Sequence, residues 1–162
     1  MTPTLRLGLA IAAAVVVLDQ ATKAMALSGL AATAPVPVTG FLNLVLVWNT
    51  GVSFGMLADN AVVGPWLLAG FALAVAAALG VWLWRVGERR IAIALGLAIG
   101  GALSNVVDRL RWGAVIDFLD FHAFGWHWPA FNLADAAITI GVGGLVLASL
   151  MESRQKARLD RS

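Results

Sequence analysis

The stretch that decides the fold is residues 61–84, AVVGPWLLAGFALAVAAALGVWLW, which contains no charged side chain. A helix needs roughly 20 apolar residues to cross a hydrocarbon layer about 30 Å thick, so this stretch predicts a transmembrane helix. The whole chain agrees, because 60% of its 162 residues are hydrophobic and only 12% are charged. Soluble domains carry about 25% charged residues, so an ordinary soluble globule, a disordered tail and a nucleic-acid-binding domain are excluded.

Three further stretches have the length and apolar character of a span. Together they predict one integral membrane domain, residues 1–162, with spans at about 5–27, 61–84, 91–109 and 132–151. Each should be helical, because lipid offers the backbone no other hydrogen-bond partner. The first stretch could also be a cleaved signal peptide. However, charged and polar residues (DQATK) stand where a small-residue cleavage site is expected, so we interpret it as a retained span.

The basic residues predict the orientation of the spans. One lies at the start of the first span, three fill the turn between the second and third, and four follow the last span. The 28–60 connection, by contrast, contains no Lys or Arg. Basic residues favour the cytoplasmic side of a membrane. We therefore expect both termini in the cytoplasm and the connections 28–60 and 109–132 on the outer side.

The two outer connections do not resemble ordinary loops. Residues 41–48, FLNLVLVW, are rich in strand-forming side chains and are followed by Asn-Thr-Gly. They predict a strand or hairpin arm on the outer leaflet, within a β region of about 36–56. Residues 115–124 are also extended in character. The predicted fold class is therefore an all-α membrane protein of four transmembrane helices with a small extracytoplasmic β region.

Ionisable residues near the bilayer are informative because each is costly there. All of them are expected near the outer face: Asp19, Lys23, Asp108, Arg109, Asp117, Asp120 and Asp135. Asp19 and Lys23 share one helix face, which predicts an internal ion pair or a contact with a substrate or headgroup. Asn105, Asp108 and Arg109 share one side of the third span and predict a structural hydrogen-bond network. Arg109 could equally bind a lipid phosphate or a substrate carbonyl.

Asp117 and Asp135 form the candidate catalytic pair. Asp117 has apolar neighbours on both sides, and Asp135 follows Asn132 by one helical turn. Two carboxylates held close together cannot both ionise cheaply, so one keeps a proton. The pair can then act as general base and general acid on one water molecule. In the alternative interpretation Asp135 caps the fourth span and Asp117 is a solvated loop residue, since sequence separation does not show that two side chains meet.

A serine nucleophile and a metal site have weaker support in the sequence. Residues 51–55, GVSFG, match the G-x-S-x-G pattern around Ser53, but that pattern requires a strand-to-helix elbow in an α/β sheet. His122 and His127 could bind a metal with Asp120, yet two histidines without a second cluster of ligands are a weak set. We therefore expect interfacial packing for the histidines, and neither a metal nor a cofactor. Because the chain has no cysteine, thiolate catalysis is excluded.

Five motifs follow one another along the chain: DQATK at 19–23, NTGVSFG at 49–55, GALSNVVDR at 101–109, VIDF at 115–118 and FNLADAAI at 131–138. In this order and spacing the chain resembles the bacterial lipoprotein signal peptidase (signal peptidase II) family, over about residues 5–150. The resemblance implies a membrane aspartic endopeptidase. It would cut diacylglyceryl-modified prolipoproteins just before the lipidated cysteine, at the outer face of the bacterial inner membrane.

The resemblance also implies a fold, roles and partners. The fold has four spans and an extracytoplasmic β-cradle. Asp117 and Asp135 match the catalytic aspartates of the family. The residues implied to hold substrate or to orient this pair are Asn49, Asn105, Arg109 and Asn132. Those with an implied structural role are Asp19, Lys23 and Asp108. The implied partners are a lipid-modified prolipoprotein and membrane lipids, with no nucleic acid. We expect a monomer that is inhibited by globomycin-type depsipeptides.

Two rival functions come from other classes. A small ion- or proton-coupled transporter would show internal repeats and polar sites near the midplane, and the sequence shows neither. A non-catalytic subunit of a larger membrane complex would tolerate Asp117→Asn and Asp135→Asn without losing a reaction. The two substitutions therefore separate an enzyme from a subunit.

Overall fold

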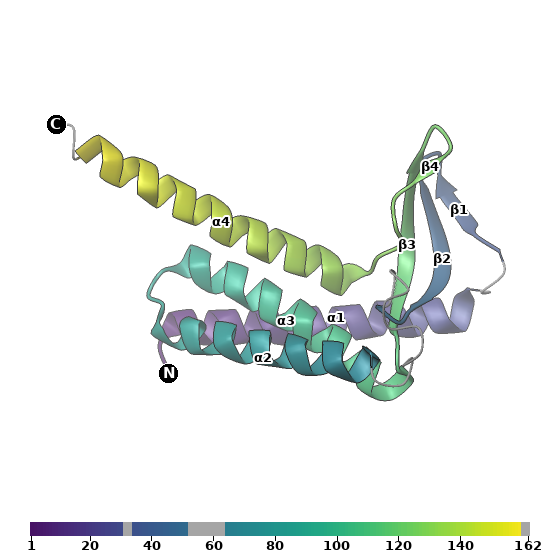
Figure 1. Ribbon diagram of the computed structural model, residues 1–162, viewed down its shortest axis with the longest axis horizontal. Helices are drawn as coiled ribbons and strands as arrows, with labels where there is room; N and C mark the ends of the chain where they lie inside the picture. Colours follow the sequence, from purple (N-terminus) through teal and green to yellow (C-terminus); the bar gives the residue numbers. More distant parts are fainter. Residues whose placement is uncertain (31–33, 52–63, 160–162) are drawn as a thin grey trace.

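A small sheet stands at one end of a helical bundle in the computed structural model, which describes residues 1–30, 34–51 and 64–159 (Figure 1). The elements follow the order α1 (Pro3–Gly29), β1 (Val36–Thr39), β2 (Leu42–Asn49), α2 (Gly64–Arg85), α3 (Arg89–Trp112), β3 (Val115–Ala123), β4 (Trp126–His127) and α4 (Leu133–Leu159). The start of α1 and the end of α4 lie at the end of the bundle opposite the sheet. The predicted fold class is confirmed.

The four helices are long and apolar enough to cross a membrane, at Pro3–Gly29, Gly64–Arg85, Arg89–Trp112 and Leu133–Ser153. The start of α1 follows from its sequence. Thr2 accepts a hydrogen bond from the Leu5 N–H at 3.2 Å, and Pro3 occupies the first helical position, where its missing donor costs nothing. The expected β region reached residue 56, but its part beyond residue 51 lies outside the described residues.

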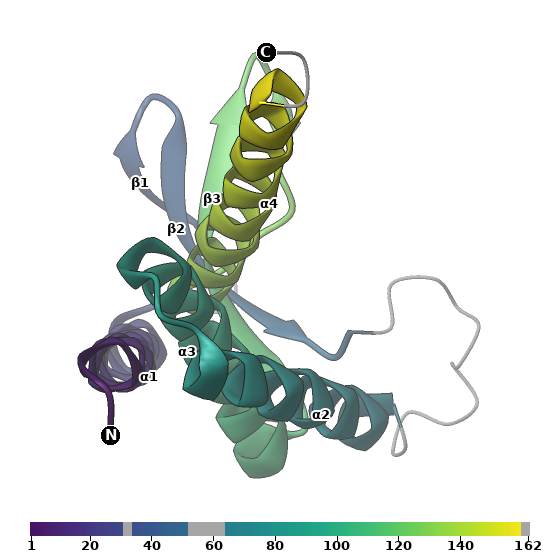
Figure 2. The same cartoon turned by 90° about the vertical axis from the view of Figure 1, so that its left-hand side faces the viewer.

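Helix α3 is the centre of the bundle. Figure 2 looks along the helices and shows α3 between α1, α2 and α4. Most of α3 is buried, whereas the other three helices expose most of their residues. Small residues make this possible: a Cβ on Gly96 would lie 2.5 Å from the Gly8 carbonyl oxygen of α1, and one on Gly141 of α4 would lie 2.6 Å from the Ala94 oxygen. The backbones therefore touch where these glycines stand.

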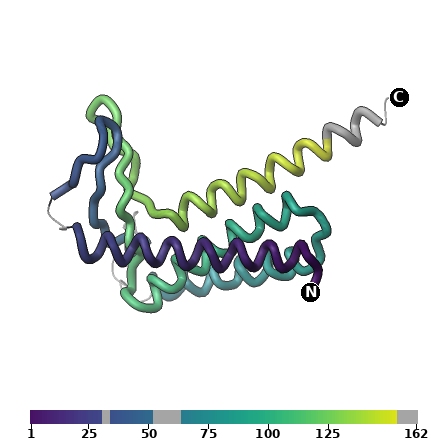
Figure 3. Tube along the Cα trace, turned by 180° about the vertical axis from the view of Figure 1, so that it is seen from behind, coloured from purple at the N-terminus to yellow at the C-terminus, as the bar shows by residue number. Residues whose placement is uncertain are grey.

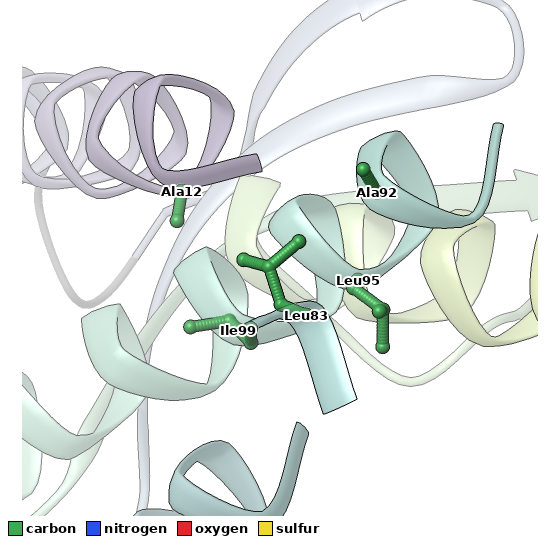
Figure 4. Packing of buried hydrophobic residues seen from close by; sticks show 5 residues of the cluster. All are labelled: Ala12, Leu83, Ala92, Leu95 and Ile99. Carbon is green, nitrogen blue, oxygen red and sulfur yellow. The ribbon is translucent and has the colours of Figure 1, made fainter. Parts of the chain in front are cut away.

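A cluster of buried apolar side chains lies near the turn between α2 and α3. Figure 4 shows the buried side chains that meet there, which are Ala12, Leu83, Ala92, Leu95 and Ile99. Leu83 is completely buried and reaches across to α1 beside Gly8. The cluster therefore holds α1, α2 and α3 together at the end of the bundle that is remote from the sheet.

The sheet is antiparallel, with strand order β1-β2-β3-β4. The long strands β2 and β3 pair so that Asn43 lies opposite Asp120 and Val47 lies opposite Asp117, with an irregularity in register between the two pairs. Helix α1 runs the length of the bundle to the base of this sheet (Figure 3). The chain enters β3 directly from α3, because Gly113 ends the helix in the left-handed conformation with φ of 69°.

Candidate active site

Asp117 lies on β3, four residues after the turn at Gly113, and is 1% exposed. Its Oδ2 accepts a hydrogen bond from Asn49 Nδ2 at 2.9 Å, and its Oδ1 accepts one from Asn132 Nδ2 at 2.6 Å. Burial raises the pKa of Asp117 to about 6; the charge of Asp135 adds to the rise, while the two amide hydrogen bonds oppose it. This carboxyl therefore holds its proton at a higher pH than an ordinary aspartate.

Asp135 belongs to the first turn of α4, where it takes part in a reciprocal cap. Asn132 Oδ1 accepts from the Asp135 N–H at 2.9 Å, and Asp135 Oδ2 accepts from the Asn132 N–H at 3.3 Å. This is the geometry of a capping box. Asp135 Oδ1 faces the other way and accepts from Asn105 Nδ2 of α3 at 2.7 Å. The expected cap is thus present, and it leaves one carboxylate oxygen directed at a second element.

Asn132 brings the two aspartates to one place. This residue is completely buried, its side-chain amide donates to Asp117, and its backbone N–H donates to Asp135. Both carboxyls therefore accept a hydrogen bond from the same residue, one from its side chain and one from its backbone. They come from different kinds of element, because Asp117 is on a strand and Asp135 is on a helix. The two residues thus lie at the junction of the sheet with the bundle, and not on opposite sides of it.

The amides around the pair have a fixed orientation. Asn49 Oδ1 accepts from the Gly51 backbone N–H at 2.8 Å, and Asn132 Oδ1 accepts from the Asp135 backbone N–H at 2.9 Å. A backbone N–H can only donate, so each amide oxygen must face it. The NH2 group of each amide is then left to face the Asp117 carboxylate, which is where the structure places it.

Two hollows open beside the aspartates. One, of about 280 Å³, is lined by Asp117 together with Val47, Trp48, Asn49, Thr50, Pro129 and Ala130. The other, of about 400 Å³, is lined by Asp135 together with Trp128, Phe131, Ala136, Thr139 and Ile140. The second hollow continues along α4 over apolar side chains, within the part of that helix that can cross a membrane. Each carboxyl therefore borders space that a polypeptide or an acyl chain could enter.

Arg109 is the cation nearest to this site on α3. Its Nη1 lies 3.4 Å from the Asn105 carbonyl oxygen, and within the described residues its buried Nε has no hydrogen-bond partner. The guanidinium interacts electrostatically with the carboxylates of Asp135, Asp108 and Asp117. Within the described residues its N–H donors are therefore not used by the carboxylates of the pair.

Asp19, Lys23 and Asp108 form a separate buried cluster next to the pair. Lys23 Nζ lies 2.6 Å from Asp19 Oδ2 and 2.7 Å from Asp108 Oδ2. Asp19 and Lys23 are thus an internal pair, as one of the two interpretations expected. The sequence did not indicate that Asp108, from another helix, completes the cluster, because no local spacing links α1 to α3.

Asp120 and the two histidines lie further along the sheet. His127 Nδ1 is 2.9 Å from both Asp120 oxygens, and the rings of His122 and His127 stack with centroids 5.1 Å apart. Burial raises the pKa of Asp120, but hydrogen bonds from Asn43 and His127 outweigh it, so the pKa is lowered. Within the described residues no group of three or more metal-ligating side chains is arranged to hold a metal ion.

Some residues around the site were missed from the sequence, and one candidate is not described. Ser104 Oγ donates to Asp19 at 2.7 Å, and Gln20 Nε2 donates to Asp108 at 2.7 Å. Gln20 lies inside the DQATK motif at 19–23, which is the only feature of the sequence that pointed to it. Trp128 lines the hollow beside Asp135. Ser53 falls outside the residues that the structure describes.

Comparison with known proteins gives a consistent result. The family model described as signal peptidase (SPase) II matches residues 11–151. A lipoprotein signal peptidase from Methylobacterium sp. (strain 4-46) is 51% identical over 146 residues, covering 89% of this chain and 88% of that protein. A lipoprotein signal peptidase from Azoarcus sp. (strain BH72) is 46% identical over 149 residues, covering 91% and 85%.

The fold is also similar to that of solved structures. One is a bacterial membrane enzyme determined by the in meso method at 2.3 Å resolution. It matches with a TM-score of 0.79 and 30% sequence identity, over 92% of this chain and 90% of that chain. A second such structure, at 1.9 Å resolution, matches with a TM-score of 0.78 over 88% and 92% of the two chains.

Proposed function

The chain belongs to the signal peptidase II family, and from this premise we propose that it removes signal peptides from prolipoproteins by aspartic catalysis. The substrate is a precursor that carries a diacylglyceryl group, and the enzyme cuts the peptide bond just before the lipidated cysteine. The observation that carries the aspartic mechanism is the double contact of Asn132, which binds Asp117 through its side chain and Asp135 through its backbone.

The reaction needs one proton shared by the two aspartates. The ionised carboxylate takes a proton from a water molecule as the water oxygen attacks the scissile carbonyl carbon. The protonated carboxyl of the pair gives its proton to the carbonyl oxygen, which forms a tetrahedral intermediate. The C–N bond then breaks as a carboxyl returns a proton to the leaving nitrogen of the cysteine. Burial of Asp117 beside Asp135 favours this singly protonated state near neutral pH.

The four polar residues assigned by the resemblance divide into two roles. Asn49, Asn105 and Asn132 donate to the carboxylates, and we assign them mainly to holding the pair in place. Arg109 has donors free of any bond to these carboxylates in the described structure, and we assign it to the carbonyl oxygens of the substrate. The chemistry uses protein carboxyls and water, so the proposal requires neither a metal nor a cofactor.

The location of the site suits a substrate that is anchored in lipid. The apolar hollow beside Asp135 follows α4, so it can receive the lipid group while the scissile bond lies at the membrane surface. The basic residues at the opposite end of the bundle favour the cytoplasm. We therefore propose a single-domain, monomeric enzyme of the bacterial inner membrane, with both termini inside and the site on the outer face.

The test is cleavage of a lipidated precursor by the purified protein in detergent. Asp117→Asn and Asp135→Asn should each remain folded and lose cleavage. Glu152→Gln removes an exposed acid far from the site and should cleave like the wild type. A globomycin-type depsipeptide should block the wild-type reaction. Substantial turnover by either aspartate variant would contradict the paired mechanism.

A further inference from the structure

Lys23 is buried at the centre of a saturated set of hydrogen bonds. The residue is 1% exposed, although less than a quarter of the apolar segment of the helix that carries it is buried. Its ammonium group reaches Asp19 at 2.6 Å, Asp108 at 2.7 Å and Asn105 Oδ1 at 3.0 Å. An ammonium group has three N–H donors, so these three acceptors use all of them.

The two carboxylates that bind Lys23 also hold the backbone beside each aspartate of the pair. Asp108 Oδ2 accepts from the Ile116 N–H at 3.2 Å, and Ile116 directly precedes Asp117. Asp19 Oδ1 accepts from the Ala134 N–H at 2.8 Å, and Ala134 directly precedes Asp135. The strand that carries one aspartate and the helix that carries the other are thus each fixed by a carboxylate one residue away.

The third acceptor of Lys23 sets the orientation of an amide. An ammonium can only donate, so the oxygen of Asn105 must face Lys23. The NH2 group of Asn105 then points to Asp135, whose Oδ1 it reaches at 2.7 Å. With the amide turned over, two donors would face each other at Lys23 and the Asp135 carboxylate would face an oxygen. Lys23 therefore determines that Asp135 receives a donor.

Stability alone is a poor reason for such a cluster. Replacing a buried ion pair by well-packed apolar residues is often neutral or stabilising, because burial removes the charges from water. The charged cluster also orients specific groups: one of its three branches ends at the Asp135 carboxylate, and the other two end at the backbone N–H of the residues that precede Asp117 and Asp135. A hydrophobic cluster could fill the space but could not hold two backbone N–H groups and one amide.

We propose that Lys23 is a positioning residue for the reaction, which sets the placement of Asp117 relative to Asp135 through Asp108, Asp19 and Asn105. This inference rests on the proposed function, since it gives Lys23 a part in the same catalysis. It goes beyond the structural role that the resemblance implies for Lys23. A lysine needed only for folding would affect the amount of folded enzyme, whereas a positioning lysine affects the rate of each folded molecule.

The test compares kcat and KM per folded molecule in detergent, with a lipidated precursor as substrate. Lys23→Met/Asp19→Asn removes the ammonium and one carboxylate together, so a single carboxylate charge remains buried, and the new amide oxygen can still accept from Ala134. Leu83→Ala is the matched control, because it destabilises the apolar cluster at the far end of the bundle and leaves the charged cluster of Lys23, Asp19 and Asp108 unchanged. Folded protein is quantified by size-exclusion chromatography and circular dichroism for each variant.

We expect the double variant to lose about a hundredfold in kcat, since small misplacements of reacting groups cost this much, with KM changed by less than about twofold. Leu83→Ala should keep the wild-type kcat. A folded double variant with wild-type kcat overturns the inference, and so does a control that loses kcat equally. If the double variant does not fold, Gln20→Leu removes an uncharged donor to Asp108 and Ser104, leaves the charges of the cluster in place and should lower kcat severalfold. Wild-type kcat in that variant also overturns the inference.

Cleavage by the wild-type protein separates a failure of the proposed function from a failure of the positioning role of Lys23. If the wild-type protein does not cleave the lipidated precursor, the proposed function fails and the inference fails with it. If the wild type cleaves and the folded lysine variant cleaves equally fast, only the positioning role of Lys23 fails.

Discussion

The raised pKa of Asp117 predicts that replacing this residue by asparagine favours stability more in neutral and alkaline solution than in acid. Asp117 is almost fully buried, beside Asp135, and is ionised above about pH 6. Asp117→Asn has nearly the same shape and cannot ionise. Its amide oxygen can accept from one of the two amide donors, but its NH2 group would face the other donor, at a cost that does not change with pH. The stability of the variant relative to the wild type should therefore rise once Asp117 has lost its proton.

The size of the effect follows from the shift in pKa. The value moves from 3.8 to about 6. One pKa unit corresponds to about 1.4 kcal/mol, so the shift corresponds to about 3 kcal/mol. Water in the adjoining hollow screens the charge, and we reduce the expectation to about 2 kcal/mol. The folded state binds this proton more tightly than the unfolded state, so wild-type stability falls as the pH rises from about 4 through 6.

The assay is reversible unfolding in mixed micelles at about pH 4 and about pH 8, where the proton is bound and released respectively. Asp120→Asn is the matched control on the same strand. Its pKa is lowered in the folded protein, so its substitution should cost more stability at pH 8 than at pH 4, and the pH dependences of the two variants should differ in sign. An Asp117→Asn protein whose stability difference from the wild type does not rise between pH 4 and pH 8 would refute the reasoning.

Two further predictions concern packing and the serine motif. Gly100→Ala should destabilise the bundle by about 1–3 kcal/mol in thermal unfolding, because its Cβ would lie 2.6 Å from the Ala12 carbonyl oxygen; Gly143→Ala, which meets nothing within 4 Å, should not. Ser53→Ala should retain most of the cleavage of a lipidated precursor, since the proposed chemistry uses water and two carboxyls; loss of cleavage would make Ser53 a candidate nucleophile.

The helical part of the fold could be predicted because a membrane span is a local property of the sequence. An uncharged stretch such as 61–84 predicts a helix by length and polarity alone. The central place of α3 was not predicted, because it depends on contacts with three other helices. The signal was present in glycines such as Gly96 and Gly100, but small residues are common in spans and do not name their partner. Strand order also depends on distant pairing, such as β2 with β3.

The polar residues of the site could be selected from the sequence, whereas their connections could not. The free-energy cost of an ionisable side chain at membrane depth identified Asp19, Lys23 and Asp135 from the sequence alone. The two interpretations of Asp135, a helix cap and a partner of Asp117, were posed as alternatives. The structure shows that its two oxygens divide the tasks, one in the cap and one towards Asn105. Sequence spacing treats a side chain as one point and therefore could not find this division.

The burial of α3 inside three lipid-facing helices has a consequence for redesign. Many apolar side chains of α1, α2 and α4 point outward and are exposed at the surface of the molecule. Examples are Val17, Leu67, Phe71 and Val146. Exchanging such positions for polar helix formers would give a water-soluble analogue whose interior is untouched. An analogue of this kind could be studied in plain buffer, with the junction of sheet and bundle still assembled around its original framework.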